Sequence, residues 1–373
     1  MSETSHVPDQ PGDGDVPGWR VLTAVARGAV HEQAGRPLQD AAGFAAYPPG
    51  DPRWLAVAVA DGHGGHPHFR SARGSELAID AGLLLAGEAA AGFAGRQSAH
   101  DLRSAAKAEL IPELIGHWRR AVEHDLLQHP WTDQEQQLLS GDDPTIAYGS
   151  TLLLAVVAVP WLVLCQIGDG DIVLVGADGT ASLPVPGDPR LDGHSTTSLC
   201  QLDAADAFRV AVVDLAGGQA AALLLATDGF GNAQTADPWH QPVGSDLLRL
   251  AQEHGVAWVR EQLPIWAARC ASNEGSGDDT AMALLLRTEG PPEPPAARTQ
   301  TRPARTLPIE TPPEPTRVAQ IPVAPTPPAA AEPEPTRPAK TLPWPRQAGP
   351  AGQGAPAVKQ AREAPPAPGA PAL

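Results

Sequence analysis

The chain has 373 residues, enough for two or three average domains or for one large domain with extensions. Its 43 acidic and 26 basic side chains give a formal net charge of −17 at pH 7. Because nonspecific binding to nucleic acid depends on Lys and Arg contacts with phosphates, this charge excludes DNA and RNA as expected partners.

Two further features concern the cellular setting. No run of about 18 apolar residues is evident, and residues 1–18 are acidic and polar, unlike a signal peptide. The three cysteines, Cys165, Cys200 and Cys270, are odd in number and far apart, which favours neither a disulfide framework nor a Cys-x-x-Cys metal site. We therefore expect a cytoplasmic protein that does not bind a membrane.

Composition divides the chain into three parts. Residues 1–17 are polar and predicted to be disordered, and residues 18–289 carry the apolar patterns of one folded domain. Residues 290–373 form a Pro- and Ala-rich tail. From Pro291 onward, 83 residues hold 24 of the 42 prolines and carry a charge of +3, which leaves −20 for the other 290 residues. Such a tail buries too little apolar surface to offset the entropy lost on ordering, so we predict a disordered C-terminal arm.

Within residues 18–289, eight short apolar stretches bounded by Gly, Asp or Pro have the length of strands. In chain order they are Arg20–Arg27, Trp54–Ala60, Ser150–Val159, Trp161–Ile167, Asp171–Val175, Phe208–Val213, Ala222–Ala226 and Thr280–Leu286. Four segments have the spacing of amphipathic helices: Arg70–Phe93, Asp101–Leu127, Ser245–His254 and Val256–Ala271. This order indicates an α+β fold in which helices cover the outer faces of packed sheets.

Carboxylates recur where these strands end or begin. Asp61, Asp169 and Asp228 follow strands and precede Gly, Asp278 and Asp279 precede the last strand, and Asp40 opens a further candidate strand. A single Asp-Gly pair is common turn chemistry. As a set, these side chains are predicted to meet at one edge of a sheet, where carboxylate and carbonyl oxygens bind Mg²⁺ or Mn²⁺.

Four motifs that contain these residues resemble the signature of the metal-dependent serine/threonine phosphatases of the protein phosphatase 2C type. They are Leu55–Gly65, Gly149-Ser150-Thr151 with Gly168-Asp169, Ala226–Gly229 and Gly277–Thr280, in the order the family has them. The resemblance covers about Gly18 to Arg287. It implies a four-layer α-β-β-α sandwich, with two antiparallel sheets flanked by helices. It also implies hydrolysis of phosphoserine or phosphothreonine on protein substrates in bacterial signalling.

The resemblance implies roles for individual residues. Two ions, Mn²⁺ or Mg²⁺, would be held by Asp40, Asp61, the Gly62 carbonyl, Asp228 and Asp278. Asp61 would bridge the ions, and His63 would be the general acid that protonates the leaving alkoxide. Two ions about 4 Å apart lower the pKa of a shared water and offset phosphate charge, which is the chemistry that such hydrolysis requires.

Three positions depart from the family pattern. Gln39 stands where the family often has Glu, which removes one negative charge from the cluster. Asn232 stands where a second Asp often binds a third ion, a site that Asp169 could still join. Gly35 stands where many members have a phosphate-binding Arg, and the candidate replacements are Arg36 and Arg27. With His31-Glu32, the Gln39-Asp40 pair resembles a bacterial subgroup of the family.

These departures keep a second hypothesis open: a catalytically weak, phosphatase-like module that binds partners or senses phosphorylation. The tail is compatible with it, because Thr301–Pro308 recurs as Thr336–Pro343 with seven of eight residues matching, and Pro-Glu-Pro-Thr-Arg also occurs twice. Repeated motifs in a Pro-rich arm can dock a partner twice and gain avidity, although low-complexity drift explains them equally well.

A third interpretation concerns His63, His66 and His68, which could form a Zn²⁺ site. Their spacing matches no common zinc pattern, and the glycines beside His63 indicate a loop. We expect His66 and His68 to lie at the start of a helix and to face solvent.

Overall fold

The computed structural model describes residues 14–16, 18–49, 52–139, 141–191 and 196–288. The C-terminal tail, with both copies of its repeated motifs, lies outside the described residues. Residues 14–16, which we predicted to be disordered, instead form a short strand that pairs with the next strand through Asp15 and Arg20. The turn that joins the two strands contains Gly18, whose φ of 80° favours glycine, so a tight hairpin begins the described domain.

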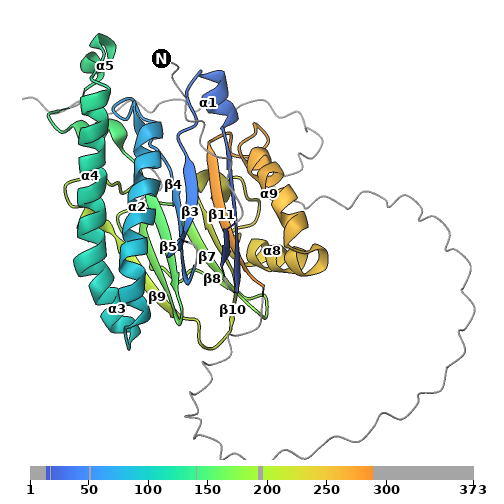
Figure 1. Ribbon diagram of the computed structural model, residues 1–373. Helices are drawn as coiled ribbons and strands as arrows, with labels where there is room; N and C mark the ends of the chain where they lie inside the picture. The colour runs from blue at the N-terminus through green and yellow to red at the C-terminus, as the bar shows by residue number, and fades with distance from the viewer. Residues whose placement is uncertain (1–13, 17, 50–51, 140, 192–195, 289–373) are drawn as a thin grey trace, which may run out of the picture.

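Two sheets form the centre of the domain (Figure 1), and every strand pairing in them is antiparallel. The first sheet has the order β1-β2-β11-β10-β7-β8 and the second has the order β3-β4-β5-β6-β9. The strands of the first sheet are β1 (Gly14–Val16), β2 (Trp19–Ala26), β7 (Asp171–Gly176), β8 (Ala181–Ser182), β10 (Ala220–Ala226) and β11 (Thr280–Arg287). Those of the second sheet are β3 (Ala41–Tyr47), β4 (Trp54–Ala60), β5 (Leu152–Ala158), β6 (Trp161–Ile167) and β9 (Arg209–Asp214).

Helices cover the outer face of each sheet (Figure 1). On the second sheet lie α2 (Ser71–Ala94) and α4 (Ile111–Gln128), which is preceded by α3 (Ala99–Ala105) and a π-helical turn (Ala106–Leu110). On the first sheet lie α8 (His240–His254) and α9 (Val256–Cys270). The shorter helices are α1 (Ala29–Gln33), α5 (Asp133–Leu138), the 3₁₀ turn Pro144–Tyr148, α6 (Ala204–Ala207) and α7 (Asp228–Gly231). The arrangement confirms the four-layer α-β-β-α sandwich.

Three apolar clusters hold the layers together, one at each junction. The cluster between the second sheet and its helices includes the fully buried Trp118, and the cluster between the first sheet and its helices includes Trp266. In β10, Leu223 and Leu225 face the second sheet, whereas Leu224 faces the helices. Because both faces of such strands are buried, their sequences are continuously apolar and do not alternate with polar residues.

Helix α2 is apolar over much of its length, although charged residues such as Asp80 and Glu88 interrupt its sequence. It is the one helix among the described residues that is long and apolar enough to cross a membrane, and 44% of the relevant window is buried. Its buried side chains, among them Leu77, Ala78 and Phe93, pack against the second sheet. These are the contacts of a helix in the core of a folded domain.

Candidate functional site

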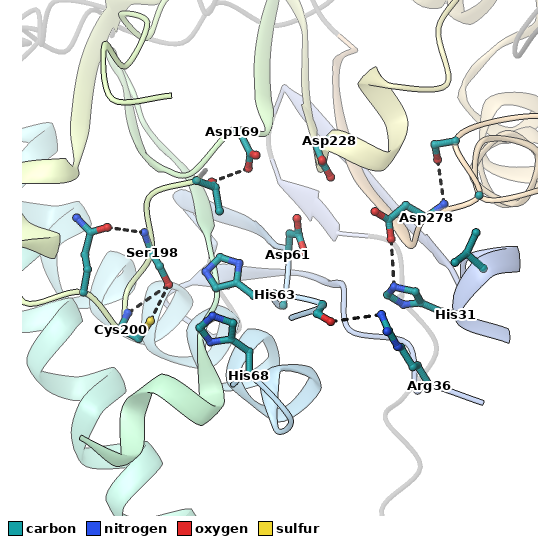
Figure 2. Close-up of a pocket in the computed structure, with 17 residues that line it drawn as sticks. His31, Arg36, Asp61, His63, His68, Asp169, Ser198, Cys200, Asp228 and Asp278 are labelled. Atoms are coloured by element: carbon teal, nitrogen blue, oxygen red, sulfur yellow. Dashed lines mark hydrogen bonds and ion pairs between the residues drawn. The ribbon is translucent and has the colours of Figure 1, made fainter. Parts of the chain in front are cut away.

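A pocket of about 760 Å³ opens where several strands end. The carboxylates that were predicted to meet lie at these strand ends. Asp61 follows β4, Asp228 begins α7 directly after β10, and Asp278 precedes β11. Asp169 lies in the turn between β6 and β7. Figure 2 shows Asp61 near the centre of the site, with Asp169 and Asp228 above it and Asp278 beside it. The antiparallel register produces this convergence, because the end of β10 pairs with the start of β11 through Ala226 and Met282.

Asp40 lies behind the pocket wall, where it is 6% exposed. Its Oδ2 accepts a hydrogen bond of 2.7 Å from the hydroxyl of Thr227. Because Asp40 does not line the pocket, it is placed to act on the neighbouring carboxylates without touching a substrate.

The buried carboxylates repel one another. Burial, followed by the charges of neighbouring carboxylates, raises the pKa values of Asp40 and Asp61 well above the usual range. Burial, with the charges of Asp169 and Asp278, raises the pKa of Asp228 to about 6. A bound cation would favour the ionised forms that burial and repulsion disfavour.

The donor chemistry fits a hard divalent cation such as Mn²⁺ or Mg²⁺, because the site offers carboxylates and the carbonyl of Gly62. Among the residues that the structure describes, however, no group of three or more His, Cys, Asp or Glu side chains is arranged so that it could hold a metal ion without moving. The fit is thus one of ligand type and charge, and the carboxylate side chains must adjust when an ion binds.

Gly62 occupies a position that only glycine fits. Its amide donates to the Gln39 carbonyl at 3.1 Å, and it forms an isolated β-bridge with Ser150. A β-carbon at this residue would lie 2.6 Å from the Ser71 carbonyl oxygen and 2.7 Å from that of Gln39, both of them backbone atoms. The tight packing fixes the backbone between Asp61 and the start of the next loop.

His63 and His68 lie side by side on one wall of the pocket (Figure 2), with ring centroids 4.9 Å apart. Burial, together with the charge of His68, lowers the pKa of His63 to about 4. The expected position of His68 was wrong: α2 begins only at Ser71, and His68 Nδ1 donates to the Ile146 carbonyl at 2.5 Å. His66 is exposed, as expected, so the three histidines do not converge on one ion.

The two candidate phosphate-binding arginines lie in different places. Arg36 lines the pocket, and its Nη1 donates to the Gly64 carbonyl at 3.3 Å. Arg27 is not among the lining residues, and its guanidinium donates to the backbone carbonyls of His31 and Arg36. Arg27 thus supports the loop that carries Arg36, and Arg36 is the arginine placed to meet a phosphate.

Asp169 and Asp228 line both the first pocket and a second pocket of about 320 Å³ beside it, which Asn232 also lines. The hydroxyl of Thr196 donates to Asp169 at 2.8 Å, and the amide of Asn232 donates to Asp228 Oδ2 at 3.1 Å. Asn232 thereby helps to hold Asp228. An Asp at this position would add a charge to the second pocket instead.

The contacts of His31 and Asp279 were not predicted from the sequence. Asp279 is 3% exposed and accepts the backbone amides of Gly28 and Gln39, both at 2.6 Å. His31 Nδ1 lies 2.9 Å from Asp279 Oδ2, and its Nε2 lies 3.3 Å from Asp278 Oδ1. The tandem aspartates were the available signal, because consecutive residues at a strand start point in opposite directions.

The family model described as "Protein phosphatase 2C" matches residues 27–266, and no curated protein matches the chain. Among solved structures, serine-threonine phosphatase 2C from Toxoplasma gondii is 16% identical, with 74% of this chain and 98% of that chain covered and a TM-score of 0.47. The catalytic domain of the phosphatase PstP, in complex with two manganese ions, is 18% identical, with 73% and 99% covered and a TM-score of 0.43.

A third similar structure, the serine/threonine phosphatase of S. agalactiae, is 15% identical, with 72% and 100% covered and a TM-score of 0.44. The family match spans more than half of the chain and includes the strand ends that carry Asp40, Asp61, Asp169 and Asp228. The chain therefore belongs to the protein phosphatase 2C family of serine/threonine protein phosphatases.

Proposed function

We propose that the protein removes phosphate from phosphoserine and phosphothreonine of other proteins, using a water activated by two divalent ions, in a cytoplasmic bacterial signalling pathway. The observation that carries this proposal is the convergence of Asp61, Asp228 and Asp278 on one pocket, with raised pKa values for Asp61 and Asp228. Mn²⁺ or Mg²⁺ would be the cation.

The proposed metal ligands come from four of these residues, and a fifth acts indirectly. Asp61, the Gly62 carbonyl, Asp228 and Asp278 would hold the ions directly, and Asp40 would act through water. Bound ions of this kind lower the pKa of a water molecule and neutralise charge on the phosphate. The place of Asp169 beside the neighbouring pocket supports a further ion there.

Arg36 and His63 would act on the substrate. Arg36 lies at the pocket, where its guanidinium can orient a phosphate oxygen. His63 would give a proton to the leaving serine or threonine oxygen. Because the pKa of His63 is about 4, its imidazole is neutral at pH 7, and a bound phosphate dianion is needed to favour the protonated form.

The second hypothesis, a catalytically weak regulatory module, is favoured by one observation. The side chain of Gln39 is neutral, and its Nε2 donates to Ser71 Oγ at 2.5 Å and to the His63 carbonyl at 3.4 Å. Where the family often has a negatively charged Glu, this chain therefore has a neutral amide that is held by two hydrogen bonds. Whether the protein is an active phosphatase or a regulatory module, we propose that the repeated motifs of the tail dock a protein partner.

The test is hydrolysis of p-nitrophenyl phosphate and of a phosphothreonine peptide, with Mn²⁺, Mg²⁺, Zn²⁺ or EDTA. We expect turnover with Mn²⁺ or Mg²⁺, none with EDTA, and none in Asp61→Asn. Asp133→Asn, an exposed carboxylate on α5, is the matched control and should retain activity. Full activity of Asp61→Asn would exclude the two-ion mechanism. Absence of turnover in a folded wild-type protein would favour the regulatory module.

A further inference from the structure

His31 has a defined orientation, because Asp279 faces one of its two ring nitrogens. The Asp279 carboxylate accepts the amides of Gly28 and Gln39 and faces His31 Nδ1 at 2.9 Å. Both oxygens of this carboxylate already accept an amide hydrogen bond, so we assign Nδ1 as the donor in the third contact. Nε2 is then the nitrogen that faces the pocket.

Nε2 does not face water alone. It lies 3.3 Å from Asp278 Oδ1, and His31 is only 7% exposed (Figure 2). Either a proton on Nε2 or a metal ion close to both atoms offsets the repulsion between the ring nitrogen and the carboxylate oxygen. A histidine whose other nitrogen donates to a carboxylate is also the usual arrangement of a metal-binding imidazole.

A second, independent feature lies beside Nε2. Gln39 is 6% exposed, and its Oε1 has no hydrogen-bond partner within the described part of the chain. A β-carbon built on Gly64 would lie 3.8 Å from both Gln39 Oε1 and His31 Nε2, and 3.7 Å from Arg36 Nη1. The bare glycine thus leaves a small space on which the Gln39 acceptor, the His31 imidazole nitrogen and the Arg36 guanidinium converge. A buried carbonyl oxygen in such a place requires a donor, such as a water molecule on an ion.

We infer that His31 is a metal ligand, binding through Nε2 the same divalent ion that Asp278 binds, while Gln39 Oε1 accepts a hydrogen bond from a water on that ion. This inference rests on the proposed metal-dependent function and assigns a ligand to its cluster. Two ligands on one ion, with bonds of about 2.1 Å at right angles, lie about 3 Å apart. The separation of 3.3 Å between Nε2 and Oδ1 is close to that value.

The assignment predicts a metal preference. An imidazole nitrogen suits Mn²⁺ better than Mg²⁺, which prefers oxygen ligands and retains its waters. His31→Gln should therefore weaken Mn²⁺ binding by about tenfold or more and change Mg²⁺ binding much less. Calorimetric titration of the full chain with each metal measures both affinities without any turnover.

The decisive experiment is pulsed electron paramagnetic resonance of Mn²⁺ bound to the full chain. We expect a ¹⁴N coupling in the wild type that changes to a ¹⁵N pattern when the protein is labelled with ¹⁵N-histidine. Because this comparison uses the unmutated protein, it does not depend on how a variant folds. His31→Gln should lose the coupling. His66→Gln, an exposed histidine of the neighbouring loop, should keep it.

Two results would overturn the inference and leave the proposed function standing: bound Mn²⁺ with no nitrogen coupling, or a coupling that persists in His31→Gln. The first would make His31 a residue that merely positions Asp278 by donating a hydrogen bond. If Mn²⁺ bound equally to wild type and Asp61→Asn, the metal cluster itself would be refuted, and the inference would fall with it.

Discussion

Thr227 and Asp40 link the two sheets through a buried hydrogen bond. Thr227 follows β10 in the first sheet, Asp40 precedes β3 in the second, and the hydroxyl of Thr227 donates to Asp40 Oδ2 at 2.7 Å. The same hydroxyl accepts the amide of Ala281 in β11 at 2.9 Å. One side chain thus aligns the ends of strands from both sheets beneath the carboxylate cluster.

Replacing Thr227 by Val should destabilise the fold. The variant leaves the Ala281 amide and the Asp40 carboxyl without this partner, at a cost of about 1–3 kcal/mol for buried polar groups. Thr227→Ser keeps the hydroxyl and should lose much less. Urea unfolding in EDTA measures both variants. Equal stability of Thr227→Val and wild type would show that the hydrogen bond contributes nothing.

Much of the fold could be predicted because Gly, Asp and Pro mark the ends of most strands. The exceptions are β1, which we predicted to be disordered, the two-residue β8, which was not predicted, and β3, which was indicated only by its expected start at Asp40. In β3 the reason lies in the sequence. All seven of its residues are half-buried, and Gly43 interrupts it, so its sequence shows neither alternation nor a β-branched run. The small residue has a structural reason: a β-carbon at Gly43 would lie 2.8 Å from the Ile79 side chain of α2.

The carboxylates of the site were predictable because each follows or precedes a strand. The contacts around them were not. His31 meets Asp279 across 248 positions of sequence, and Gln39 meets Ser71 across 32. Such contacts depend on how the loop after β2 folds over the ends of both sheets, which no local pattern encodes.

Two glycines of α2 should respond oppositely to alanine. The backbone of Tyr148 packs directly against Gly74, whose carbonyl also accepts the Trp118 indole at 3.0 Å. Gly74→Ala would force these segments apart, so we expect a loss of more than about 2 kcal/mol, as in overpacked cores. Gly92 has nothing within 4 Å of its missing β-carbon, so Gly92→Ala should stabilise by about 0.5–1 kcal/mol.

Thermal and urea unfolding of the two alanine variants provide the measurement, and each is the control for the other. If Gly74→Ala were also stabilising, α2 would not approach the 3₁₀ turn as closely as the structure indicates.

Without metal, the domain should become less stable as the pH rises. The folded pKa of Asp228 is about 6, compared with an ordinary value of 3.8, and those of Asp40 and Asp61 are also raised. The folded state therefore retains protons that the unfolded chain releases. The stabilisation that comes from these retained protons is complete below about pH 4, where the unfolded chain is also protonated. It is lost as the pH rises through the folded pKa values.

Melting temperatures in EDTA and in Mn²⁺, from about pH 5 to about pH 8, test this prediction. We expect the EDTA series to fall across this range relative to Asp228→Asn, which lacks the titrating group. The Mn²⁺ series should rise, because the ion binds the ionised carboxylates. A pH dependence identical in wild type and Asp228→Asn would contradict the raised pKa.

The titration of His63 should depend on its neighbour His68. In metal-free protein, nuclear magnetic resonance of the His63 ring should give a pKa of about 4, owing to burial and to the charge of His68. In His68→Gln the second cause is removed, so the pKa of His63 should rise, while burial keeps it below 6.5. An unchanged titration in the variant would show that burial alone sets the value.

Deletion of residues 290–373 should separate catalysis from docking. Thr288, the last described residue, donates its amide to the Gly18 carbonyl at 3.2 Å, so β11 is complete before the tail begins. We expect the shortened chain to keep its melting temperature and its turnover of p-nitrophenyl phosphate, and to hydrolyse a protein substrate that the tail recruits less efficiently at low substrate concentration. The control is a full-length chain in which only Thr301–Pro308 and Thr336–Pro343 are scrambled, which preserves charge and proline content.

Because a tether acts by raising the local concentration of its partner, both variants should raise KM for that substrate and leave kcat unchanged. A large loss of small-phosphoester turnover on deletion would instead mean that the tail contributes to the site itself.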